Sequence, residues 1–220
     1  MGSTTPYSIA FLPPPCTKLT RPTPSNPTPP NNPPIFNDAM HVRTIVFVDE
    51  QGCAPENEMD EADATSWHWV LYTEGENGVQ VPFGTIRLVA GPHPPHEGHS
   101  SHTGSDKEGE KKKEEEPYIR LTRVAILAEY RRAGFGRILQ DVALEWAAKH
   151  PEEMTAAAGE GSPAWNGLTL VHAQVQAEGM YARVGFVTDE SMGSWDEEGI
   201  MHVGMWKRIE VGSESKLEKQ

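Results

Sequence analysis

The sequence predicts a mixed α+β protein built around one domain of about 170 residues, a size that can bury one proper hydrophobic core. Three observations predict this class. Segments with helical spacing of apolar residues alternate with segments rich in β-branched and aromatic residues. The expected order is helix, two strands, strand, helix, strand, helix, strand, with no internal repeat. One junction between a strand and a helix carries a turn rich in glycine and arginine.

Composition divides the 220 residues into a domain with flanking tails. Residues 1–34 contain 11 of the 19 prolines, and a segment with so little apolar surface is expected to be a largely disordered tail. Residues 7–12, YSIAFL, are a candidate edge strand within it. The domain is expected at 35–210, with a low-complexity, disordered insertion at 91–117 and a flexible tail at 211–220.

The first half of the domain predicts a helix followed by a hairpin. Apolar residues recur at helical spacing in residues 37–52, where Asn37 or Asp38 can cap the helix. Residues 66–72 and 81–90 have the composition of strands and are joined by a turn-like TEGENG segment. An antiparallel pair of strands is therefore expected.

The second half of the domain alternates strands and helices. β-Branched residues predict buried strands, and a proline ends the longest helix because it cannot continue the hydrogen-bond ladder. The expected elements are a strand at 118–127, a helix at 136–150 before Pro151, a strand at 168–175, a short helix at 177–184 and a closing strand at 199–209.

The net charge of −13 argues against nucleic acid as the main partner. It suits a cationic substrate, since an acidic surface concentrates amines, and equally a protein that is merely soluble. No secretory signal and no apolar run long enough for a membrane span is present, so no membrane partner is expected. Cys16 and Cys53 do not make a disulfide framework. A cytoplasmic, intracellular protein is expected, and a nuclear location stays open.

Four histidines repeat at every third position in the insertion, which raises the question of a metal site. They are His93, His96, His99 and His102. No cysteine accompanies them, and the glycine, proline and serine between them favour a flexible chain. We expect a solvated loop and no metal.

The turn RRAGFGR, residues 131–137, lies between a strand and a helix and is typical of an anion-binding site. The N–H groups at a helix start are free, and the helix dipole is positive there. Glycine permits positive φ, and arginine forms bidentate phosphate contacts. A Walker loop needs a GK[ST] ending and a dinucleotide loop needs a glycine at Leu139, so both fail. The alternative to an anion site is an ordinary helix start whose glycines only avoid steric clashes.

At this turn the sequence resembles a known family. The pattern Arg131-x-x-Gly134-x-Gly136 matches the pyrophosphate-binding signature of the GCN5-related N-acetyltransferases, the GNAT superfamily. Residues 174–186, QVQAEGMYARVGF, resemble the second signature of that family, which normally begins with asparagine.

Two further stretches, residues 42–63 and 197–205, resemble the YjcF/ElaA-like branch, which is often grouped with glucosamine-6-phosphate N-acetyltransferases. The resemblance covers about 37–209 apart from the insertion. It implies the GNAT fold, an α+β architecture with a central mixed, mostly antiparallel sheet flanked by helices. Homodimers are common in that branch, so a homodimer stays open.

The resemblance also implies acetyl-CoA as co-substrate. The N–H groups of the glycine turn would hold its pyrophosphate, and the backbone of the preceding strand would bind the pantetheine arm and acetyl carbonyl. Gln174 replaces the family's asparagine. The implied binding residues are Val124, Ala125, Ile126, Arg131, Arg132, Ala133, Gly134, Phe135, Gly136, Arg137 and Gln174.

The implied chemistry needs an acid and a base. Tyr181 stands where the family has its usual general acid, and a phenol can protonate a leaving thiolate. An aliphatic amine is mostly protonated at neutral pH, so a base must take its proton before attack. Candidates are His172, Glu50 or a water chain ending at Glu129 or Glu198.

The acidic loop ENEMDEAD, residues 56–63, could hold a cationic amine through Glu58 and Asp60, or could be a solvated loop. Arg87, with Arg43 and Arg123, could meet a phosphate on an aminosugar or be structural.

The predicted activity is direct acetyl transfer in a ternary complex, from acetyl-CoA to the primary amine of an aminosugar, its phosphate or a polyamine. The alternatives are acetylation of a protein lysine or N-terminus, and a non-catalytic acyl-CoA-binding sensor.

Overall fold

The computed structural model describes residues 5–93 and 116–212, and its centre is a single sheet. The strand order is β1-β2-β3-β4-β5-β8-β6, and β7 pairs with β8. Only β4 and β5 run parallel, and the other pairs are antiparallel. The strands are β1 Ser8–Leu12, β2 Trp67–Glu74, β3 Gln80–Val89, β4 Ile119–Ile126, β5 Leu168–Gln174, β6 Val187–Thr188, β7 Ser194–Glu197 and β8 Ile200–Arg208. The predicted α+β class with a mixed, mostly antiparallel sheet is confirmed.

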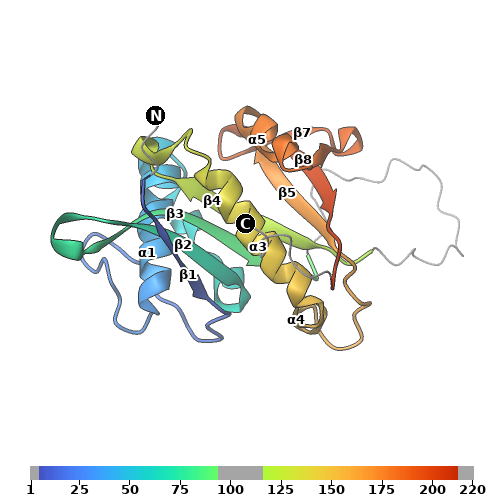
Figure 1. Ribbon diagram of the computed structural model, residues 1–220, viewed down its shortest axis with the longest axis horizontal. Coiled ribbons are helices and arrows are strands. Elements are labelled where there is room, and N and C mark those ends of the chain that lie inside the picture. Colours follow the sequence, from blue (N-terminus) through green and yellow to red (C-terminus); the bar gives the residue numbers. More distant parts are fainter. Residues whose placement is uncertain (1–4, 94–115, 213–220) are drawn as a thin grey trace, which may run out of the picture.

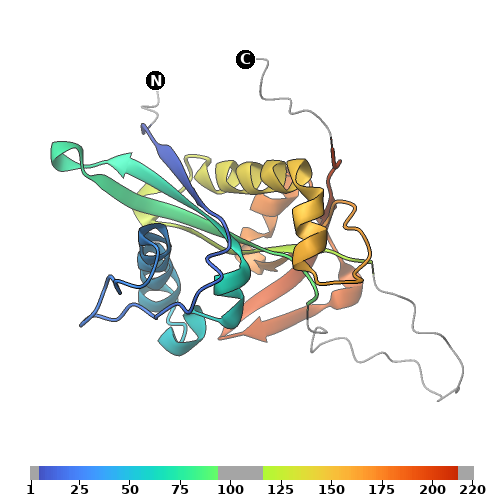
Figure 2. The same ribbon diagram turned by 90° about the horizontal axis from the view of Figure 1, so that it is seen from below.

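Helices cover both faces of the sheet, with α3 on one side and α1 on the other (Figure 2). The main apolar core is formed mostly by side chains of β2, β3 and α3. The helices are α1 Pro34–Arg43, continued by a π-helix at Thr44–Glu50, α2 Pro55–Glu58, α3 Phe135–Lys149, α4 Pro151–Ala157 and α5 Glu178–Arg183. Short 3-10 turns occur at Glu61–Thr65, Glu76–Gly78, Ala128–Tyr130, Val175–Ala177 and Glu190–Met192.

The expected elements of the domain are all present, within a few residues at their ends. The first helix begins at Pro34, where the fixed φ of proline suits the first helical turn, and its second half widens into a π-helix. The sequence analysis assigns no structure to α4. Pro151 ends α3 as expected, but it also occupies the first position of α4, the one helical position that tolerates proline.

The structure places residues 5–33 against the domain, where composition alone predicts a largely disordered tail. β1 forms the edge of the sheet beside β2, as expected for residues 7–12. Farther along, Leu19 is buried against α1. Asn32 binds both the N–H and the carbonyl of Thr20, at 2.8 and 2.7 Å. Proline counts do not reveal these few anchoring contacts. Residues 94–115 and 213–220, where disorder is also expected, lie outside the described residues.

Strands β4 and β5 separate along their length. They pair only at Ile119 with Thr169 and at Arg120 with Leu170, and Figure 1 shows them apart beyond that point. The register between β3 and β4 also shifts, and Arg123 has a φ of +54° there, so β4 contains a bulge. The divergence and the bulge leave backbone groups in the second half of β4 without a partner strand on the β5 side.

Candidate active site

Two adjoining cavities occupy the space where β4 and β5 diverge. The larger cavity has a volume of about 620 Å³ and is lined by the glycine turn, the end of β4 and α5. The smaller cavity has a volume of about 150 Å³ and lies between β4, β5, β7 and β8. Both are lined by Gln51, Val124, Gln174, Ala177 and Met180, so the two cavities meet at these residues.

The glycine turn presents a row of free N–H groups to the larger cavity. No hydrogen bond from the N–H groups of residues 132–136 to any described residue is found. Gly134 precedes α3 with a φ of +88°, and Arg132 has a φ of +65°. These left-handed conformations turn successive N–H groups toward one side, at the positive end of a 15-residue helix. The turn therefore has the form of an anion cradle.

Ten of the eleven residues expected to bind the co-substrate line the larger cavity, and Ala133 does not. The lack of a side chain at Gly136 makes room for Met180, because a Cβ at this position would come within 2.8 Å of the Met180 sulfur. Glycine thus lets α3 and α5 approach closely at the point where the two cavities meet.

Arg131 and Glu50 form an ion pair at the edge of the larger cavity. Arg131 donates from Nη2 to Glu50 Oε2 at 2.5 Å and from Nε to the carbonyl of Ile126 at 2.8 Å. These contacts tie the glycine turn to the π-helix and to the end of β4. Glu50 lines neither cavity, so the structure does not bring this candidate base to the other catalytic candidates.

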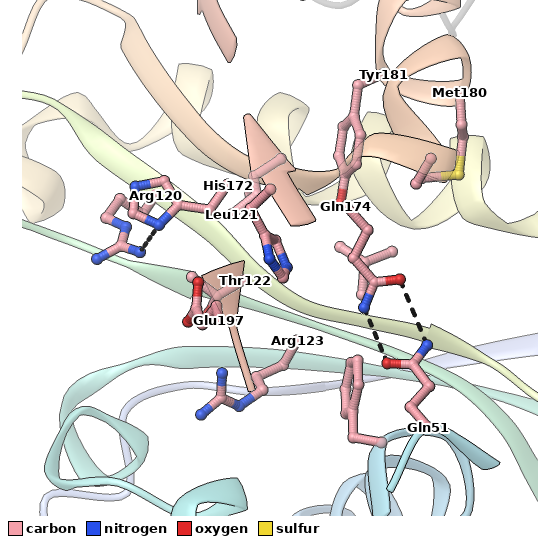
Figure 3. Close-up of a pocket in the computed structure, with 14 residues that line it drawn as sticks. Gln51, Arg120, Leu121, Thr122, Arg123, His172, Gln174, Met180, Tyr181 and Glu197 are labelled. Carbon is pink, nitrogen blue, oxygen red and sulfur yellow. Dashed lines mark hydrogen bonds between the residues drawn. The ribbon is translucent and has the colours of Figure 1, made fainter. Parts of the chain in front are cut away.

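Tyr181 reaches the smaller cavity from α5. Its hydroxyl points toward Gln174, as Figure 3 shows. Gln174 is held in turn by Gln51, to which it donates at 2.9 Å. Burial raises the pKa of Tyr181 above its ordinary value, so the phenol keeps its proton at neutral pH and can donate it.

Two histidines line the smaller cavity, and their hydrogen bonds fix opposite tautomers. The His172 Nδ1 accepts from Arg120 Nη2 at 3.0 Å, because a guanidinium can only donate. A neutral His172 therefore carries its proton on Nε2. The His202 Nδ1 donates to the carbonyl of Ile200 at 2.8 Å, which leaves the lone pair of the neutral ring on Nε2. Of the two neutral rings, only that of His202 has a lone pair on Nε2 that can accept a proton.

The acidic loop is held by arginines of the chain itself. Arg43 binds Glu58 at 2.5 Å and Asp63 at 2.7 Å, and all three side chains are buried. Arg87 binds Asp60 at 2.6 Å and Asp63 at 2.8 Å. Burial by itself would raise the pKa of Asp63, but Arg43 and Arg87 hold it far below its ordinary value.

Arg123 completes this cluster by binding Glu58 at 3.3 Å and Asp60 at 3.2 Å. The cluster, which we call the ion cluster, contains three arginines and three carboxylates: Arg43, Arg87, Arg123, Glu58, Asp60 and Asp63. The predicted substrate ligands Glu58, Asp60 and Arg87 line neither cavity. Their positions fit the structural alternative.

The two candidate ends of a water chain also lie outside both cavities. Glu198 accepts hydrogen bonds from the Ala54 N–H and from Asn57 Nδ2, each at 2.7 Å. It fastens the turn between β7 and β8 to the loop before α2. Glu129 is exposed in the short turn after β4.

Sequence reasoning missed three residues of the smaller cavity that have titratable side chains: Arg120, Glu197 and His202. The alternation of side chains along a strand offers a signal for Arg120, which lies on the same face of β4 as residue 122. His202 lies within the stretch 197–205, which the sequence analysis used only as a sign of resemblance. The tautomer that distinguishes it depends on a backbone carbonyl two residues away and needs coordinates.

Across residues 5–93 and 116–212, no helix has the length and apolar character needed to cross a membrane. The same residues contain no group of three or more histidine, cysteine, aspartate or glutamate side chains placed to hold a metal ion. Of the four spaced histidines, only His93 is described, and its Nε2 contacts the carbonyl of Tyr118 at 3.1 Å.

Comparison with known proteins places this geometry among acetyltransferases. Residues 42–140 match the Acetyltransferase (GNAT) domain family. The Bacillus subtilis (strain 168) protein BSU40680, named as an acetyltransferase, is 31% identical over 177 residues, covering 79% of this chain and 89% of that protein. YjcF of the same organism, named as an uncharacterized N-acetyltransferase, is 30% identical over 173 residues, covering 78% and 91%.

Solved structures agree on the fold. Escherichia coli ElaA superposes with a TM-score of 0.53 at 17% identity, over 92% of this chain and 99% of that chain. The predicted similarity to YjcF is confirmed, and ElaA has the same fold. The grouping with glucosamine-6-phosphate N-acetyltransferases stays a prediction.

Proposed function

The chain belongs to the GNAT acetyltransferase family, and from this premise we propose that it transfers an acetyl group from acetyl-CoA to the primary amine of a small molecule. One observation carries the proposal. A protonated phenol, Tyr181, and the imidazole of His202, whose neutral ring has its lone pair on Nε2, line one small cavity that adjoins a cavity with an anion cradle.

The larger cavity suits coenzyme A. The family implies an acyl-CoA co-substrate, and a volume of about 620 Å³ is typical of sites for ligands of this kind. The free N–H groups of residues 132–136, Arg132 and Arg137 would hold the pyrophosphate. The backbone of Val124 to Ile126 and the Gln174 amide would direct the arm toward the smaller cavity.

The smaller cavity supplies the groups for proton transfer. His202 Nε2 accepts a proton from the acceptor amine, and the neutral nitrogen forms a bond to the thioester carbonyl carbon. The N–H of Val124, beside the bulge, stabilises the oxyanion. As the carbonyl re-forms and the carbon–sulfur bond breaks, Tyr181 gives its proton to the leaving thiolate. The new amide nitrogen loses its extra proton, which restores the Tyr181 phenol.

Two features favour direct transfer in a ternary complex to a small acceptor. Neither Cys16 nor Cys53 lines a cavity, so no thiol is placed to form an acyl-enzyme. The smaller cavity, at about 150 Å³, is below the usual range for drug-sized ligands and suits a small amine better than a folded protein segment.

A thiol-release assay with acetyl-CoA tests the proposal, with spermidine, glucosamine, glucosamine-6-phosphate and a lysine peptide as acceptors. We expect turnover with at least one small amine. Tyr181→Phe and His202→Gln should each lower kcat by about 100-fold or more, as expected for loss of an acid or base. His172→Gln is the matched control and should lose less.

Tight coenzyme A binding without turnover of any amine would favour the sensor. Turnover of the peptide alone would favour a protein acetyltransferase. Unchanged rates in Tyr181→Phe across pH would remove the assigned acid.

A further inference from the structure

Arg120, on β4, is a partly buried cation without a carboxylate partner among residues 5–93 and 116–212. A guanidinium has five N–H donors, and Arg120 makes one hydrogen bond to another described residue, His172. The Nε–H of Arg120 is buried and has no partner among the described residues. No carboxylate of the described chain lies within ion-pair distance of it either.

An unpaired donor on a buried cation is costly, because the charge has lost its water without gaining an anion. Native structures satisfy nearly all such groups, with a ligand or ordered water where the chain supplies nothing. Burial lowers the pKa of Arg120, but a guanidinium remains charged at neutral pH. Glu197 and Asp60 attract this charge from a distance, but no carboxylate of the described residues forms an ion pair with it.

The neighbouring carboxylates do not form an ion pair with Arg120. Each of the three carboxylates of the ion cluster is already bound by two of its arginines. The one carboxylate that lines the smaller cavity within the described residues is Glu197, which is exposed and lies beyond ion-pair distance of Arg120. Arg123 lines the same cavity and adds a second guanidinium to its wall.

We propose that Arg120 binds an oxyanion, a carboxylate or a phosphate, on the amine that this protein acetylates. The inference rests on the proposed function for the identity of the reacting group. Figure 3 shows Arg120 and His172 on one side of the cavity and Tyr181 with Gln174 on the other. An acceptor held by its anion at Arg120 would therefore present its amine toward the acetyl group.

The geometry also bears on the shape of the acceptor. Arg120 and Val124 are four residues apart, so their Cα atoms are separated by at most roughly 13 Å, the length of regular strand, and the bulge at Arg123 shortens this distance. The Arg120 side chain covers part of this distance. The oxyanion and the reacting amine are thus separated by several bonds in the acceptor, as in a phosphorylated aminosugar or an ω-amino acid. A polyamine, which is cationic throughout, does not match the Arg120 guanidinium, which has no ion-pair partner among the described residues.

Matched pairs of acceptors test the proposal in the thiol-release assay. The phosphate pair is glucosamine-6-phosphate and glucosamine, and the carboxylate pair is 5-aminovalerate and pentylamine. We expect kcat/KM to favour the anionic member of at least one pair, and the favoured pair identifies the oxyanion. Arg120→Met should lower kcat/KM for that member by about 100-fold, the effect expected when a buried charge pair loses one partner. Its effect on the neutral member should be small, and Arg120→Lys should restore part of the loss.

Arg208→Met is the control for overall charge, since Arg208 is exposed and pairs with Glu116 away from both cavities. It should leave the preference for the anion unchanged. Thermal unfolding separates a binding role from a folding role, because removal of an unpaired buried charge should not lower Tm.

Equal kcat/KM within both pairs, or equal losses for both members in Arg120→Met, would overturn the inference and leave the acetyltransferase proposal standing. If no amine is turned over, the acetyltransferase proposal fails by itself. Calorimetric titration of the coenzyme A-loaded protein with each pair still tests the anion site. Binding of an anionic member that disappears in Arg120→Met supports the site, and no such binding refutes it.

Discussion

The conformation of Gly134 gives the sharpest test of the anion cradle. Its φ of +88° lies in the left-handed region, which costs an L-residue about 1–2 kcal/mol. A Cβ at Gly134 would meet nothing within 4 Å, so the strain of Gly134→Ala comes from the backbone alone. If the turn relaxes to relieve this strain, its N–H groups leave their positions, and acetyl-CoA must restore them on binding. The expected rise in KM for acetyl-CoA is about 5- to 30-fold, equivalent to 1–2 kcal/mol.

Gly161→Ala is the matched control for this substitution. Gly161 has a φ of +82°, is exposed after α4, has nothing within 4 Å of a Cβ and lines neither cavity. Thermal unfolding should report a comparable strain in both variants, up to about 2–8 °C in Tm. Only Gly134→Ala should raise KM for acetyl-CoA, and Gly134→Val should raise it further. Equal KM values in the two alanine variants would show that the cradle does not bind the co-substrate.

Three further predictions concern packing and charge. Gly136→Ala should raise KM for acetyl-CoA with little change in Tm. The new Cβ would lie 2.8 Å from the Met180 sulfur, so the flexible Met180 side chain must move. Adding Met180→Ala should reverse the rise in KM. Arg43→Met should lower stability by up to about 3–5 kcal/mol in urea unfolding, since it removes one of the two arginines that bind each of the buried carboxylates Glu58 and Asp63, whereas Lys149→Met, which breaks an exposed pair, should cost under about 1 kcal/mol. Burial lowers the pKa of His68 from 6.5 to about 4, so the unfolded state binds more protons between these values and stability falls as pH falls below about 6.5. The loss at pH 5 should be about 2 kcal/mol by urea midpoint relative to pH 7, and a His68→Gln variant with the same pH dependence would contradict this assignment.

Local patterns predicted the elements that depend on local chemistry. The spacing of Gly134 and Gly136 predicted the turn, and ten of the eleven residues named from it and from β4 and β5 line the larger cavity. Tyr181 was found in the same way, through its place in a signature. The positions of these residues could be predicted because one short segment supplies both the backbone conformation and the contact, and their roles stay predictions.

Residues whose role depends on distant partners could not be assigned from the sequence. Glu58 looked like an exposed acid because its loop is highly charged, yet it is buried against Arg43, 15 residues away. His172 looked like a base until Arg120, 52 residues away, fixed its tautomer. Charge patterns show which residues are ionised but not which ionised residues meet, and that pairing separates a structural acid from a catalytic one.

Strand β4 connects the stability of the domain to its chemistry. Arg123 lies at the bulge with a φ of +54°, and its side chain is held by Glu58 and Asp60 of the ion cluster. The same strand places Arg120 in the smaller cavity and the backbone of Val124 where the two cavities meet. The ion cluster thus stabilises a backbone conformation that a non-glycine residue adopts only at a cost. This explains why five of the six residues of the ion cluster lie outside both cavities although the cluster adjoins them. Through Arg123, the cluster holds β4 in the shape that directs the Arg120 guanidinium and a backbone donor into one cavity.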